Sequence, residues 1–152
     1  NCSVNKEITH LMGQGLVTQS TSPWAAPIMV ARKKNGDIRL VIEYRALNAQ
    51  TFDQYHPIPR IDDLIDRLGE AKYFSSLDLK SGYYHMPLRE EDSDLTGFVT
   101  PDGHFQWTCQ GTPFGLSGAP ASFQRLMSGV LGSLNWQVAL CYLDDILVWG
   151  TT

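Results

Sequence analysis

The sequence has few cysteines, no long hydrophobic run and no excess of positive charge, and each shortage excludes a class of protein. Cys2, Cys109 and Cys141 are far apart and form no Cys-x-x-Cys pair. This spacing argues against a disulfide framework or a structural zinc site and fits a reducing compartment. No apolar run approaches the ~20 residues needed to span a bilayer. The first ten residues also lack the pattern of a signal peptide.

Charge is modest in amount and slightly acidic in balance. The chain carries 12 Lys and Arg residues against 16 Asp and Glu residues, a formal net charge of −4. A protein that binds nucleic acid usually has a basic surface, so the sum alone does not favour one. Placement matters more than the sum, because several basic residues gather between positions 32 and 45. They are Arg32, Lys33, Lys34, Arg39 and Arg45.

The composition is otherwise that of a folded domain. The 152 residues are 43% hydrophobic and 18% charged, which is typical of a globular chain long enough to bury a core. We find no internal repeat, low-complexity tract or linker. We therefore expect a single compact unit over residues 1–152.

Apolar spacing predicts an α+β fold. Helical spacing occurs in residues 5–15, 62–68 and 120–134. Apolar runs of strand length occur in residues 26–31, 38–44, 73–79, 98–100, 105–107, 138–143 and 146–149. Asn35-Gly36 and Pro101-Asp102-Gly103 are turn signals between such runs. We expect antiparallel hairpins with helices packed on one side.

The same spacing predicts which side chains are buried. The run at 73–79 is expected to be a buried strand. In the first helix Ile8, Leu11 and Met12 are expected to form the apolar face. In the helix at 120–134 the expected face is larger. Its members are Phe123, Leu126, Met127, Val130, Leu131 and Leu134.

Two adjacent carboxylates, Asp144 and Asp145, separate the apolar runs at 138–143 and 146–149. Removing carboxylates from water is costly, and two neighbours also repel, so apolar flanks suit them poorly. A bound divalent cation would supply the missing charge and prefers oxygen ligands. Neighbouring side chains of a strand point to opposite faces, so we expect the pair at or beside a tight turn. The alternative is an ordinary polar turn, where Asp is common.

A third acid, Asp78, lies within another apolar run, at 73–79. It could instead cap a helix or be a buried acid bonded to backbone N–H groups. If all three acids meet at one edge of a sheet, they can hold two magnesium ions. Two such ions are what phosphoryl transfer to a hydroxyl requires.

Tyr142-Leu143-Asp144-Asp145 resembles the Tyr-x-Asp-Asp signature of reverse transcriptases. Further segments stand in the order and approximate spacing of gypsy-type LTR retrotransposon enzymes, namely residues 22–27, 44–48, 55–64, 74–83 and 113–127. The resemblance covers nearly the whole chain. It implies an RNA-directed DNA polymerase with the right-hand polymerase fold. The chain would hold the fingers and part of the palm, ending after the catalytic hairpin, with the thumb absent.

The resemblance implies a role for each acid. Asp78, Asp144 and Asp145 match the three catalytic, metal-binding carboxylates. The backbone carbonyl of Leu79 matches a further metal ligand. The implied cofactor is Mg²⁺, two ions, with Mn²⁺ able to substitute.

The resemblance also implies a nucleotide site. Tyr83, five residues after Asp78, matches the steric gate that excludes a 2′-hydroxyl, although it could be plain core. Lys33 and Arg39 match residues that grip the triphosphate, and their chemistry suits a polyanion; the alternative is a solvated basic hairpin. Phe114 takes the place near the nucleotide that retroviral enzymes fill with Gln.

Pro23 and Trp24 resemble a template-binding segment, where Trp24 could stack or simply pack. The implied partners are an RNA or DNA template with primer and deoxynucleoside triphosphates, with no membrane. Thumb, RNase H and integrase regions of a polyprotein would accompany this chain. The implied location is cytoplasmic, in a virus-like particle, with access to the nucleus.

The chain departs from the family pattern in three places. Glu43 replaces the usual Asp before Tyr-Arg, residues 84–86 differ from the common His-Gln-Ile, and the loop at 108–112 is longer than usual. Two rival functions remain. One is a non-catalytic relic or domesticated domain that binds nucleic acid or protein. The other is an RNA-templated RNA polymerase, which Tyr83 disfavours because ribonucleotides need room for the 2′-hydroxyl.

Overall fold

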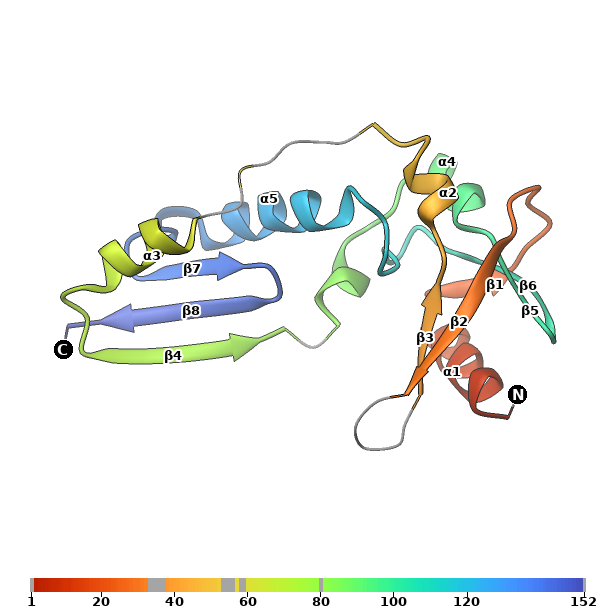
Figure 1. Ribbon diagram of the computed structural model, residues 1–152, viewed down its shortest axis with the longest axis horizontal. Coiled ribbons are helices and arrows are strands. Elements are labelled where there is room, and N and C mark those ends of the chain that lie inside the picture. The colour runs from red at the N-terminus through yellow and green to blue at the C-terminus, as the bar shows by residue number, and fades with distance from the viewer. Residues whose placement is uncertain (1, 33–37, 53–56, 58–59, 80, 152) are drawn as a thin grey trace. The chain divides into compact units, whose positions relative to one another are not determined.

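The computed structural model describes residues 2–32, 38–52, 57, 60–79 and 81–151 (Figure 1). The chain forms two compact units, each assembled from two stretches of sequence. Unit 1 comprises Asn1–Phe52 with Tyr83–Ser117, and unit 2 comprises Asp53–Gly82 with Gly118–Thr152. The sequence pattern led us to expect one unit. Because each unit combines distant segments, no linker-like composition marks the boundary between them.

Unit 1 contains a five-stranded sheet in the order β1-β6-β5-β2-β3. Its strands are β1 (Val17–Gln19), β2 (Ala26–Arg32), β3 (Ile38–Ile42), β5 (Phe98–Thr100) and β6 (Gly103–Trp107). The β2–β3 and β5–β6 pairs are antiparallel, which confirms both predicted hairpins. Residues 33–37, which join β2 to β3, lie outside the described residues. In contrast, β2 and β5 run parallel, a pairing that the hairpin signals did not predict.

Unit 1 also contains three helices and 3₁₀ turns among its described residues. They are α1 (Cys2–Gly13), α2 (Arg45–Asn48), α4 (Glu90–Ser93) and the 3₁₀ turn η2 (Asp94–Thr96), with the 3₁₀ turn η1 (Gly82–His85) at its border. In α1 the buried face is Val4, Ile8 and Leu11, the i, i+4, i+7 stripe of a helix. The assignment of Met12 to that face is wrong, because its side chain is 39% exposed.

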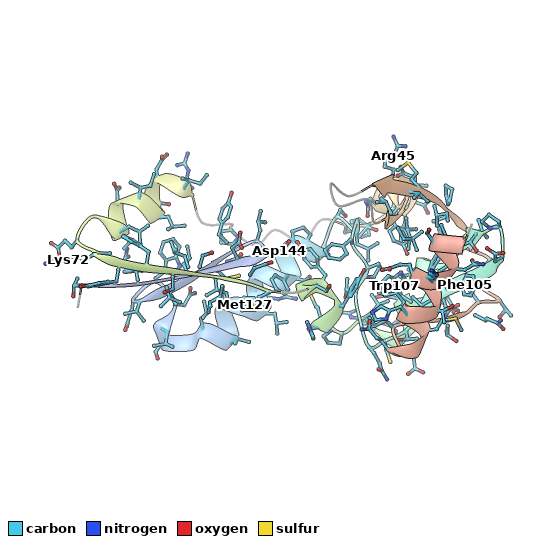
Figure 2. All side chains as sticks on the ribbon, turned by 90° about the horizontal axis from the view of Figure 1, so that it is seen from below. Arg45, Lys72, Phe105, Trp107, Met127 and Asp144 are labelled. Atoms are coloured by element: carbon cyan, nitrogen blue, oxygen red, sulfur yellow. The ribbon has the colours of Figure 1, made fainter. Side chains whose placement is uncertain are left out.

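The core of unit 1 is a continuous cluster of side chains from α1, the sheet and the segment after β3. Phe98 is fully buried and its ring lies beside that of Phe105. Tyr44 is buried as well, and its hydroxyl donates to the carbonyl of Thr96 over 2.8 Å. Figure 2 labels Phe105 and Trp107 within this cluster. The segment that follows β3 is therefore anchored to the core.

Unit 2 contains a three-stranded antiparallel sheet in the order β4-β8-β7. Its elements are α3 (Ile61–Leu68), β4 (Tyr73–Asp78), α5 (Ala119–Leu131), the 3₁₀ turn η3 (Gly132–Leu134), β7 (Ala139–Tyr142) and β8 (Asp145–Gly150). Helix α5 packs against β7. These elements confirm the predicted α+β class, and none of the helices among the described residues is long and apolar enough to cross a membrane.

Two burial predictions for unit 2 need correction. The run at 73–79 is a strand as far as Asp78, but it is not buried, since every residue of β4 is exposed. β4 is an edge strand paired only with β8, whereas α5 packs at the opposite edge. In α5 and η3, Phe123 and Met127 are buried, but three other residues of the expected face are exposed. They are Leu126, Val130 and Leu134.

Candidate carboxylate and nucleotide sites

The hairpin of β7 and β8 carries two of the three acids. Tyr142 pairs with Asp145, so only Leu143 and Asp144 form the turn (Figure 1). Leu143 has φ +54°, as the first residue of a tight two-residue hairpin turn requires. That conformation is unfavourable for a residue with a Cβ atom. The prediction that the acidic pair lies at or beside a tight turn is confirmed.

The third acid lies at the same end of the sheet. Asp78 is the last residue of β4 and is the direct cross-strand partner of Asp145. Directly opposed residues point to the same face with Cβ atoms about 4.5–5.5 Å apart. The N–H of Leu79 donates to the carbonyl of Asp144 over 3.2 Å. Asp78 is therefore on the same sheet face as Asp145, and the chain after it is bonded to the turn.

Among the described residues, the charged side chains at the end of β4 and in the β7–β8 turn are all acidic, namely Asp78, Asp144 and Asp145. Within the described residues, neither Asp78 nor Asp145 forms an ion pair. Burial raises the pKa of the Cys141 thiol to about 11, and repulsion from Asp144 and Asp145 adds to the shift. Two opposed carboxylates destabilise a strand pair unless a cation lies between them.

The donor set fits a hard divalent cation, because it consists of carboxylate oxygens at one end of a sheet. Among the described residues, no three His, Cys, Asp or Glu side chains are grouped so that they could hold a metal ion. The identification of Asp78, Asp144, Asp145 and the Leu79 carbonyl as ligands thus stays a prediction.

Two residues that the sequence analysis missed hold the hairpin in place. Gln124 of α5 is buried, and its amide donates to the carbonyl of Cys141 over 2.8 Å. The Cys141 thiol in turn donates to the carbonyl of Leu143 over 3.3 Å. Figure 2 shows Asp144 and Met127 of α5 within this unit. The sequence contains one signal for Gln124, because this polar residue lies beside Phe123 on the apolar side of the helix predicted at 120–134.

Unit 1 brings together the two aromatic residues assigned to the nucleotide site. The ring of Tyr83, in η1, meets the ring of Phe114 edge to face, with centroids 5.0 Å apart. The ring of Tyr84 also contacts Phe114, at 5.2 Å. Tyr83 is buried, whereas Phe114 is 42% exposed. A core residue and a sugar gate would both leave Tyr83 buried, so nucleotide selectivity has to separate the two roles.

The remaining predicted site residues are less defined. Trp24 is half-buried and Pro23 is exposed, and the carbonyl of Trp24 lies 2.7 Å from Nε2 of His104. Lys33 lies outside the described residues. Arg39 lies in β3 opposite Ala31, and its side chain is outside them too. Their contacts with template and triphosphate stay predictions.

Glu43, one of the departures from the family pattern, has a local structural role. Its carboxylate lies 2.8 Å from Nε of Arg45 and accepts the backbone N–H of Arg45 over 3.0 Å. These hydrogen bonds lower the pKa of Glu43. The longer side chain is thereby accommodated at the beginning of α2.

Solved structures show which class of protein has this fold. The chain superposes on a prototype foamy virus protease–reverse transcriptase with a TM-score of 0.88 and 25% identity, covering 99% of this chain and 20% of that one. It matches the foamy viral protease–reverse transcriptase in complex with an RNA/DNA hybrid with a TM-score of 0.87 and 26% identity, again over 99% and 20%. The fold is that of a reverse transcriptase polymerase.

Sequence comparisons agree with this class. Residues 31–152 match the family described as reverse transcriptase (RNA-dependent DNA polymerase). The chain belongs to the reverse transcriptase family.

Its relatives include retrovirus-related Pol polyproteins from Drosophila melanogaster. The polyprotein from transposon 412 is 39% identical over 97% of this chain, and that from transposon gypsy is 37% identical over 97%. The polyprotein from transposon 297 is 37% identical over 98%. The chain spans 14% of the transposon 297 polyprotein and 12% of the transposon 412 polyprotein.

Proposed function

We propose that this chain is the fingers and palm portion of an RNA-directed DNA polymerase that works within a Pol polyprotein. The observation that carries the proposal is the direct pairing of Asp78 with Asp145, beside a turn that contains Asp144. Carboxylates held side by side on one face of a sheet are suited to bind the divalent cations that a metal-dependent reaction on phosphate requires. Membership of the reverse transcriptase family supports the same activity.

In the proposed mechanism two Mg²⁺ ions would be held by Asp78, Asp144, Asp145 and the Leu79 carbonyl. When bound, these ions would lower the pKa of the primer 3′-hydroxyl and neutralise charge on the transferred phosphoryl group. The carboxylates fix the place where that chemistry occurs. Mn²⁺, which accepts the same oxygen ligands, could replace Mg²⁺.

The aromatic pair in unit 1 has the second role. Tyr83 and Phe114 would form the wall against which the deoxyribose of the incoming nucleotide packs. Lys33 and Arg39 would bind its triphosphate through charge-assisted hydrogen bonds. Trp24 and Pro23 would contact the template strand.

The proposed partners are a primed RNA or DNA template and deoxynucleoside triphosphates. Two of the solved relatives are described in complex with double-stranded DNA and with an RNA/DNA hybrid, which supports a duplex partner here. Thumb, RNase H and integrase regions of the same polyprotein would complete the enzyme. We place it in a cytoplasmic virus-like particle with access to the nucleus.

The test is primer extension on an RNA template by the enzyme made from the polyprotein that carries this chain. We expect Asp145→Asn to lower the rate by about 100-fold or more, as removal of a group that stabilises transition-state charge does. Asp102→Asn is the matched control, because Asp102 is an exposed acid in the β5–β6 turn. It should leave the rate unchanged.

A second measurement does not depend on activity. Mn²⁺ binding to this chain, followed by electron paramagnetic resonance, should weaken in Asp145→Asn and persist in Asp102→Asn. Equal extension by Asp145→Asn and the unaltered enzyme would overturn the metal site. A wild-type enzyme that binds primed template but never extends it would instead support the non-catalytic relic.

A further inference from the structure

The loop of residues 112–117, which we call the Phe114 loop, presents the exposed ring of the nucleotide wall. Its first half is tied to the turn that carries Tyr83. The N–H of Thr112 donates to the Tyr83 carbonyl over 3.3 Å, and its hydroxyl donates to the Met86 carbonyl over 2.9 Å. Pro113, next along, is fully buried. This half of the loop is therefore attached by hydrogen bonds to the turn that carries Tyr83.

The second half of the loop is held by one side chain from elsewhere in unit 1. The amide of Asn48, at the end of α2, donates from Nδ2 to the carbonyl of Gly115 over 2.8 Å. Its Oδ1 accepts the N–H of Ser117 over 2.9 Å. A flipped amide would place N–H against N–H and oxygen against oxygen, so the two contacts fix its orientation. An amide offers both a donor and an acceptor for these two points, whereas a carboxylate offers only acceptors.

The backbone between these contacts needs such a restraint. Gly115 has φ +97°, a conformation that glycine adopts easily. Glycine adopts many other backbone conformations as well, so this residue does not by itself fix the path of the loop. An added Cβ at Gly115 would lie 3.6 Å from the carbonyl oxygen of Ile42 and 3.7 Å from the ring of Tyr44. At the position directly following Phe114, the loop thus lies against the end of β3 and against Tyr44.

Asn48 is itself connected to the core. Its backbone N–H donates to the carbonyl of Tyr44 over 2.8 Å. The Tyr44 side chain is buried and bonded through its hydroxyl to the carbonyl of Thr96. An anchored side chain therefore bridges positions 67 and 69 residues away in sequence.

We propose that Asn48 is a positioning residue for sugar selection. It fixes the Phe114 loop and, through it, the pair of rings formed by Tyr83 and Phe114. This inference rests on the proposed function, because it takes that pair as the wall against the nucleotide sugar. A wall excludes a 2′-hydroxyl only if it cannot yield, since the selection is by repulsion. Releasing the loop should therefore lower the selectivity for deoxynucleotides over ribonucleotides more than it lowers the rate of deoxynucleotide incorporation.

The kinetic experiment compares kcat and KM for one deoxynucleotide and its ribonucleotide in the polyprotein-derived enzyme. We expect Asn48→Ala to raise the KM for the deoxynucleotide with a smaller effect on kcat. The deoxy-to-ribo ratio of kcat/KM should fall about tenfold, a factor that corresponds to ~1.4 kcal/mol. Gln50→Ala is the matched control, because Gln50 is exposed just beyond α2. A merely structural loss of folded enzyme would lower both rates together and leave the ratio unchanged.

A second variant separates the two hydrogen bonds. Asn48→Asp keeps an acceptor for the Ser117 N–H but has no donor for the Gly115 carbonyl. In this chain, protection of the Ser117 amide from hydrogen exchange should be lost in Asn48→Ala and retained in Asn48→Asp and Gln50→Ala. The deoxy-to-ribo ratio of kcat/KM for Asn48→Asp should lie between the ratios for Asn48→Ala and Gln50→Ala.

The outcomes distinguish the inference from the function on which it rests. A wild-type enzyme that incorporates no nucleotide overturns the proposed function, and Ser117 protection then decides the positioning claim alone. An active enzyme whose selectivity is the same in Asn48→Ala overturns the inference and leaves the function standing. Unchanged Ser117 protection in Asn48→Ala overturns it as well.

Discussion

At the level of single residues, Tyr83 is a buried residue with a direct role in the proposed selection of the nucleotide sugar. The residue is only 9% exposed, and its ring meets that of Phe114 edge to face, an arrangement worth about 0.5–1.5 kcal/mol beyond burial. The carbonyl of Tyr83 also accepts hydrogen bonds from Met86 and Thr112. The backbone of this residue is therefore held independently of its side chain, so a smaller side chain should change the wall more than the fold.

We expect Tyr83→Val to raise ribonucleotide use more than it lowers deoxynucleotide use. Relieving a clash removes a barrier that only the 2′-hydroxyl experiences. The measurement is the deoxy-to-ribo ratio of kcat/KM in the full polyprotein-derived enzyme. Tyr73→Val is the matched control, because Tyr73 undergoes the same change on exposed β4. If both rates fall together in Tyr83→Val, Tyr83 is a packing residue.

At the level of elements, the close approach of β2 and β5 depends on one glycine. Gly97 precedes β5, and its carbonyl accepts the N–H of Ala26 at the beginning of β2 over 2.8 Å. An added Cβ would lie 2.2 Å from the backbone oxygen of Trp24, which is far inside contact distance. The parallel pairing of Ala26 with Phe98 therefore requires a residue without a side chain at position 97.

We expect Gly97→Ala to lower the free energy of unfolding by about 3 kcal/mol, the upper part of the usual range for overpacking. Gly13→Ala is the control, because nothing lies within 4 Å of a Cβ added there, at the end of α1. Replacing that helical glycine should stabilise the chain by about 0.5–1 kcal/mol. Urea unfolding measures both, and equal stability of the two variants would refute the steric argument.

At the level of the whole molecule, the two units differ in how much apolar surface they bury. Unit 1 has a continuous core in which Phe98 is completely buried. In unit 2 the edge strand β4 leaves Tyr73, Phe74 and Leu77 more than half exposed. Exposed backbone hydrogen bonds with little apolar cover open at low free energy.

Hydrogen exchange should therefore distinguish the units. We expect the amides of β4 to exchange by local opening at least tenfold faster than those of β5 and β6, since ~1.4 kcal/mol of opening free energy is a factor of ten. Residue-resolved exchange by NMR on the complete chain measures this. Equal protection of Leu77 and Phe105 would show that the strand is more stable than its exposure indicates.

Local sequence patterns predicted much of the secondary structure of this protein. The alternation of apolar runs with turn signals predicted the β2–β3 and β5–β6 hairpins, and the acidic pair between two apolar runs predicted the β7–β8 turn. Each of these depends on residues within about ten positions of one another. The resemblance to gypsy-type enzymes likewise follows from local motifs, and the comparisons confirmed that family.

Long-range pairing accounted for the rest, because registers and contacts between distant segments have no local signature. The division into two units, the parallel β2–β5 pair and the exposure of β4 all depend on which segments meet. So does the pairing of Asp78 with Asp145, whose residue types suggested a common site without specifying a register. The Asn48 amide shows this limit clearly. Its sequence neighbours predicted no contact for it, and only the folded chain brings Gly115 and Ser117 to its donor and acceptor atoms.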